Sequence, residues 1–177
     1  MSDETTAPGG GNRPANETTG KDARTDRLFL CVVDSTEECR IAIYFAVRRM
    51  LRASGRLALL YIMKPAEFQH WMSVEEKMRE EARTEAEEFL QQYASQVKDW
   101  TGEMPTLYVR EGQPAETILN LIKEEPRISI LVLGAGTDKK GPGPLVSAIV
   151  GKMSGEFPIP ITVVPGNLSQ EQIDLLT

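Results

Sequence analysis

Two groups of residues in this sequence have the types and the spacing needed to bind an anion or a small ligand. A glycine-rich loop, Gly134–Gly143, follows an apolar stretch, Ile128–Leu133, and precedes a segment of helical composition, roughly Pro144–Gly155. Glycines let a backbone approach a ligand closely, and a helix start offers free N–H groups and a positive dipole end. The second group, Asp34-Ser35, follows another apolar stretch near the N-terminus. Ligand binding is expected at these two loops.

Both loops are positioned by an alternation of apolar strands and amphipathic helices. The expected strands are 28–33, 57–63, 106–109, 128–133 and 160–164, and the expected helices are 37–54, 73–100, 115–125 and 144–155. This alternation predicts an α/β fold, a parallel sheet with helices on both faces. Ligands bind such sheets beyond the carboxyl ends of the strands, where the winding reverses. If the first and fourth strands are neighbours, the two loops face each other across that crevice.

The chain reads as one domain, 27–166, between two tails. Residues 1–26 are polar and are expected to be a disordered N-terminal tail, and 167–177 are expected to be a C-terminal tail in which Ser169 and Gln172 cap a last short helix. His70 and Trp71 are expected to anchor the long helix, with a place at the pocket mouth as the alternative. The apolar face of that helix is expected to comprise Met78, Ala82, Ala86, Phe89, Tyr93, Val97 and Trp100.

Charge and composition exclude several classes of function. The net charge of −6 and the pI of about 5.0 argue against a general binder of nucleic acid or membrane surfaces. No apolar run approaches the roughly 18–20 residues that span a bilayer, and no signal peptide is recognisable, so a cytoplasmic location is expected. Cys31 is expected in the core, without a disulfide to Cys39. A single histidine leaves little for a zinc site or a Ser-His-Asp triad.

Three segments of the chain resemble the universal stress protein family. They read LFLCVVDST, VREGQPAETILNLIKEEPRISILVLGAG and SAIVGKMSGEFPIPITVVPG, and together they extend over roughly Arg27–Gly166. The family features are an Asp and a Ser after the first strand, a Glu-Gly-x-Pro turn at Glu111–Pro114, and a Pro-x-Pro turn before the last strand. The resemblance implies a five-stranded parallel sheet in the order 3-2-1-4-5, of the adenine nucleotide alpha hydrolase type.

Some members of this family bind ATP through a loop of the form G-x2-G-x9-G-[S/T]. Position by position, the three glycines and the final hydroxyl residue of this pattern fall on Gly134, Thr137, Ser147 and Ala148. Only Gly134 has the residue type that the pattern requires. The resemblance also assigns Asp34 to the adenine side and Ile62 to the pocket wall, and the neighbouring residues Ser35, Gly136 and Ile149 complete the candidate set.

The departures from the loop pattern have physical consequences. Thr137 has a Cβ where the loop is expected to need a positive φ, and Ala148 lacks a hydroxyl worth about 0.5–1.5 kcal/mol per hydrogen bond. Ser147 offers a hydroxyl one residue earlier and is a candidate helix cap. Lys139 and Lys140 could meet phosphates, or could be two solvated charges.

Two functions from different classes are open. The first is a stress-response module that binds ATP or a related adenine nucleotide, with magnesium, and is not an enzyme, since Asp138 is the only carboxylate in the loop. The second is a homodimeric interaction protein without nucleotide. Its partner would be a second copy paired through the last strand, at Ile161, Thr162, Val163 and Val164. A related hydrolase or synthetase is disfavoured because the acidic residues 34–38 would repel phosphates.

Overall fold

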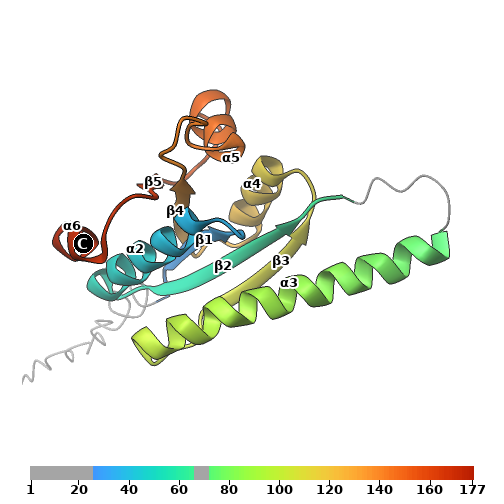
Figure 1. The fold of residues 1–177 in the computed structure, drawn as a ribbon, viewed down its shortest axis with the longest axis horizontal. Coiled ribbons are helices and arrows are strands. Elements are labelled where there is room, and N and C mark those ends of the chain that lie inside the picture. The colour runs from blue at the N-terminus through green and yellow to red at the C-terminus, as the bar shows by residue number, and fades with distance from the viewer. Residues whose placement is uncertain (1–25, 66–71) are drawn as a thin grey trace, which may run out of the picture.

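The protein is a single parallel sheet with helices on both faces. The computed structural model describes residues 26–65 and 72–177. The strands are β1 (Leu28–Val33), β2 (Arg56–Met63), β3 (Thr106–Glu111), β4 (Ile128–Ala135) and β5 (Ile161–Pro165). They pair in parallel in the order β3-β2-β1-β4-β5 (Figure 1), which confirms the predicted topology. The first and fourth strands are neighbours, so the winding reverses between them.

Within the described residues, six helical segments connect and cover the strands. They are α2 (Glu37–Ala53), α3 (Met72–Thr101), α4 (Pro114–Glu124), α5 (Pro144–Val146), the π-helix η1 (Ser147–Lys152) and α6 (Gln170–Leu176). Side chains of a strand alternate between faces, and β1 shows the result. Leu28 and Leu30 belong to a core beneath α4 and η1, whereas Phe29 and Cys31 belong to a core beneath α2 and α3.

The long helix α3 extends past the sheet (Figure 1), and this corrects its expected apolar face. Its first fully buried described side chain is Ala86, followed by Leu90, Ala94 and Val97. Met78 and Ala82, which the periodicity placed in the core, are exposed because the sheet ends before this part of the helix. Trp100 is also partly exposed, and its ring lies edge-on to Tyr44 at 5.4 Å between centroids.

The C-terminal residues form a helix that packs on the domain rather than a loose tail. Helix α6 begins with the predicted capping box, in which the Ser169 hydroxyl and the Gln172 side chain each accept a backbone N–H. Ile173 is fully buried. Asp174 accepts a hydrogen bond from the Tyr44 hydroxyl at 3.0 Å and lies 2.7 Å from Nε of Arg48, so α6 is joined to α2 by polar contacts as well.

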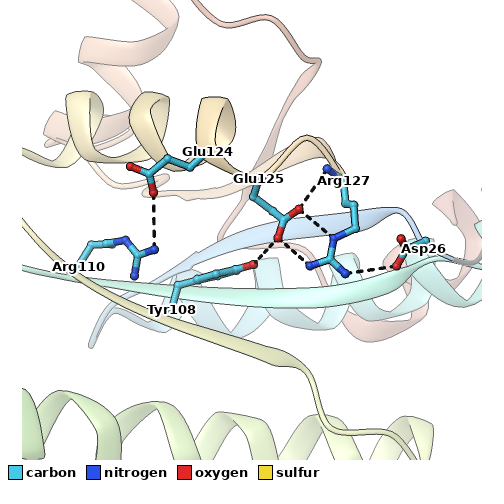
Figure 2. A network of polar contacts seen from close by, with 6 residues as sticks. All are labelled: Asp26, Tyr108, Arg110, Glu124, Glu125 and Arg127. Carbon is cyan, nitrogen blue, oxygen red and sulfur yellow. Dashed lines mark hydrogen bonds and ion pairs between the residues drawn. The ribbon is translucent and has the colours of Figure 1, made fainter.

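A polar network lies at the end of the sheet where the strands β1 and β4 begin. Figure 2 shows the guanidinium of Arg127 between the carboxylates of Glu125 and Asp26. Arg127 donates two hydrogen bonds to Glu125, at 2.8 and 2.7 Å, and one to Asp26 at 3.3 Å. The Tyr108 hydroxyl donates to Glu125 at 3.3 Å. These contacts connect the start of the described chain to β3 and to the turn between α4 and β4.

Two predictions from the sequence concern residues that the structure does not describe. The disordered tail, apart from Asp26, and the anchoring role of His70 and Trp71 both lie outside the described residues. Among the helices that the structure describes, none has the length and apolar character needed to cross a membrane.

Candidate functional site

A pocket of about 640 Å³ opens at the carboxyl ends of β4 and β5, beside the first turn of α2. Most of it is formed by the glycine-rich loop. We call it the loop pocket; it is lined by Glu38, Gly136, Thr137, Asp138, Lys140, Gly141, Gly143, Pro144, Ser147 and Gly166. It lies at the edge of the sheet where the winding reverses, which is where open α/β sheets bind ligands. Of the candidate residues, Gly136, Thr137 and Ser147 line it.

The loop is held by local hydrogen bonds and by two left-handed glycines. Asp138 accepts the N–H of Lys140 on its carboxylate, at 2.9 Å, and the N–H of Gly141 on its backbone carbonyl, at 3.1 Å. Gly141 has φ of 84° and Gly143 has φ of 92°. The expectation of a positive φ at Thr137 is therefore wrong, since among the described non-glycine residues only Ser54 has one. The turn uses Gly141 and Gly143 instead, so Thr137 fits without strain.

Ser147, in the helix after the loop, lines the loop pocket. Ser147 lies inside the helical segment and not at its cap, which is Gly143; its N–H and its hydroxyl both donate to the Gly143 carbonyl, at 3.0 and 2.8 Å. Beyond it the chain forms π-helix η1, which ends at Lys152 rather than at residue 155. Ala148 lines a different pocket, of about 330 Å³, with Pro114, Leu145 and Met153 among its lining residues.

The other residues carried over from the family pattern lie around the loop pocket without lining it. Asp34 and Ser35 are exposed at the end of β1. One carboxylate oxygen of Asp34 accepts the N–H of Thr36 at 2.9 Å and the Thr36 hydroxyl, so the side chain is already used in a local turn. Ile62 is half-buried in β2 and packs on the core beneath α4. Ile149 is fully buried, so its side chain serves packing.

Gly134 is a packing residue at this site. A Cβ added to it would lie 2.7 Å from the carbonyl oxygen of Glu38, which is too close for real side chains. The glycine therefore lets the end of β4 pass directly under the first turn of α2. A ligand role for its backbone is compatible with this contact, but the contact alone explains why a larger residue is not accommodated.

Sequence reasoning named Glu38 only as part of the acidic stretch after the first strand and did not place it in the loop pocket, which its side chain enters from α2. Asp138 is the only carboxylate in the loop itself, and Glu38 adds a second one to the pocket. The sequence does show Glu37 and Glu38 side by side in the first turn of a helix. Only the packing of α2 against β4 and β5 decides that Glu38 enters the loop pocket, while Glu37 lines a neighbouring pocket with Tyr44 and Trp100.

Two cysteines lie directly below the Asp34 turn, and both thiols are free and buried. The Sγ atom of Cys39 accepts the N–H of Asp34 at 3.4 Å. Burial is the main cause that raises the pKa of the Cys39 thiol, to about 12, and burial also raises the pKa of Cys31. Both thiols therefore stay protonated near neutral pH, which makes them poor nucleophiles. Their place in the core agrees with the expectation for Cys31.

Comparison with known proteins identifies the family. A model of the universal stress protein family matches residues 27–165. Among solved structures, universal stress protein UspA from Lactobacillus plantarum is similar to this chain, with 21% identity and a TM-score of 0.64, over 78% of this chain and 97% of that one. The chain matches none of the curated proteins.

Two further solved structures share the fold. One is a universal stress protein family protein from Arabidopsis thaliana with AMP bound, at 14% identity and a TM-score of 0.57, over 78% of this chain and 91% of that one. The other is from the universal stress protein family of Burkholderia pseudomallei, at 16% identity and a TM-score of 0.53, over 80% and 97% of the two chains. Because the family model extends from the start of β1 to the end of β5, the chain belongs to the universal stress protein family.

Proposed function

We propose that this protein is a regulatory module that binds an adenine nucleotide in the loop pocket. The observation that carries the proposal is the pocket itself, in which Gly136, Thr137 and Ser147 lie together beside the winding reversal. A relative with the same fold has been solved with AMP bound, which supports the choice of ligand class. The nucleotide would place its phosphate in the loop pocket and extend its base toward Asp34. Magnesium would accompany a ligand with several phosphates.

Thermal unfolding with and without nucleotide tests this proposal. A ligand present at 100 times its dissociation constant stabilises a protein by about 2.7 kcal/mol, a shift of roughly 5–10 °C in this size range. AMP and ATP, each with and without magnesium, are the ligands to use. No shift with millimolar AMP or ATP in any of these conditions would reject nucleotide binding.

Lys140 and Lys139 offer a matched pair of variants for the same test. Lys140 lines the loop pocket, whereas its neighbour Lys139 is exposed and is not among the lining residues. Lys140→Ala should weaken binding of a phosphate-bearing ligand about tenfold, the low end for a hydrogen bond to a charged group. Lys139→Ala should leave binding unchanged. Equal effects of both variants would show that the phosphate does not enter this pocket.

Asp34→Ala tests the other end of the proposed site. The variant also removes the local hydrogen bonds to Thr36, so its own stability will fall. The informative quantity is therefore the ligand-induced shift in each protein, and that shift should be lost in Asp34→Ala. The proposed role is binding rather than catalysis, and release of phosphate from ATP would contradict it on this point.

A second candidate function, self-association, is favoured by the exposed edge of β5. In the described sheet this strand pairs with β4, and its other edge carries no described strand. Leu131 donates its N–H to the carbonyl of Pro160, so by alternation the backbone groups of Ile161 and Val163 point away from β4. Such an edge can pair with a second copy. Val163→Pro should convert a dimer to a monomer in analytical ultracentrifugation, and a monomeric wild type would reject this role.

A further inference from the structure

Glu38 is held in the loop pocket by three glycines, two at and directly after the end of β4 and one after β5. Its backbone carbonyl lies against Gly134 at the end of β4, and its Cβ lies against Gly166 after β5, where an added Cβ would be 2.6 Å away. Its Oε1 atom lies over Gly136, at 3.4 Å from the position of an added Cβ. The side chain is half-buried. These contacts fix the helix backbone and the Cβ of Glu38, and from there the carboxylate reaches Gly136.

The charges that line the loop pocket are unfavourable for a highly charged anion. Glu38 and Asp138 are carboxylates, and Lys140 is the one cationic residue among the lining residues. The helix after the loop offers fewer donors than an ordinary helix start, because Pro144 has no N–H and both the N–H and the hydroxyl of Ser147 donate to Gly143. A phosphate over Gly136 would lie beside the Glu38 carboxylate and be repelled by it.

We propose that Glu38 makes the loop pocket select nucleotides with one phosphate over nucleotides with three. This inference rests on the proposed function and narrows its ligand class. A single phosphate can be met by Lys140 alone, at the open side of the loop. Each further phosphate adds negative charge that must be placed near Glu38 or Asp138, in a partly desolvated pocket where repulsion is stronger than in water.

Paired glutamates at the start of α2 provide the test and its control. Glu38→Gln removes the charge and keeps the shape, and Glu37→Gln removes a charge one residue away that lines a different pocket. Calorimetric titration of the wild type and both variants with adenosine, AMP and ATP, in EDTA and in magnesium, measures the preference. Circular dichroism establishes that each variant is folded.

The wild type should bind AMP at least about tenfold more tightly than ATP in EDTA. Glu38→Gln should reduce that ratio of affinities about tenfold, because the variant binds ATP more tightly. Glu37→Gln should keep the wild-type ratio, and the affinity for adenosine should be the same in all three proteins. An unchanged ratio in Glu38→Gln overturns this inference and leaves the proposed function standing. A magnesium-dependent preference for ATP that is lost in Glu38→Gln also overturns it, since Glu38 would then be a metal ligand. If no protein binds any of the three ligands, the proposed function fails together with this inference.

Discussion

Replacing Gly134 with alanine tests the close approach of β4 to α2, on which the whole site depends. A Cβ at this position would lie 2.7 Å from the Glu38 carbonyl oxygen, 2.9 Å from its carbonyl carbon and 3.2 Å from the Cys39 nitrogen. Ordinary contacts of a Cβ begin at about 3.4 Å, so the first turn of α2 would have to move by about 0.7 Å. All three neighbours are backbone atoms of a helix, which cannot rotate away as a side chain would.

The expected loss of stability follows from this overlap. Inserting a methyl group into a well-packed region costs about 1–3 kcal/mol when the backbone must shift. In a domain of this size, that loss lowers the midpoint of thermal unfolding by roughly 3–10 °C.

Thermal unfolding of Gly134→Ala without ligand, followed by circular dichroism, measures this loss. Gly151→Ala is the matched control, because a Cβ there meets nothing within 4 Å and the residue is exposed. Alanine is also a better helix former than glycine, so the control should be unchanged or slightly more stable. If Gly134→Ala melts at the same temperature as the wild type and the control, the tight contact between β4 and α2 does not exist and the account of the site is refuted.

Two further predictions use the titrating groups. The guanidinium of Arg127 lowers the pKa of Glu125 to about 2, so the ionised carboxylate adds stability at neutral pH and loses this contribution as the pH falls from about 4.5 toward 2. In urea unfolding, Glu125→Gln should be less stable than the wild type at pH 7, by an amount that shrinks over that range; a difference that is constant with pH would contradict this. Burial raises the pKa of the Cys39 thiol to about 12, so an aromatic disulfide reagent at pH 8 should label Cys39 and Cys31 slowly in the native protein and rapidly in urea. Equal labelling rates in the two states would show that the thiols are accessible.

The strands could be predicted because their signals are short-range, whereas the order in which they pair was implied by the resemblance to the universal stress protein family. Apolar runs such as Leu57–Met63, separated by helical periodicity, read locally as buried strands of an α/β fold. The cap of the last helix by Ser169 and Gln172 could likewise be predicted, since both of its hydrogen bonds join residues that are three positions apart. Periodicity failed on α3, where Met78 is exposed, because a helical pattern does not say where the sheet beneath the helix ends.

Which residues line the loop pocket depends on contacts between segments that are far apart in the chain. Local sequence patterns do not encode such contacts. The sequence alone indicated a glycine loop at the switch point, with Gly136 and Thr137 in it and Ser147 in the helix that follows. Only the tertiary structure decides that Ser147 lines the loop pocket while Ala148 lines another, because neighbouring residues of a helix point about 100° apart and the packing of the helix on the sheet sets which of them turns to the loop. It also decides that Glu38 enters that pocket, because the end of β4, with Gly134 and the adjoining Gly136, and the residue after β5, Gly166, both pack against the first turn of α2, which is distant from them in the chain.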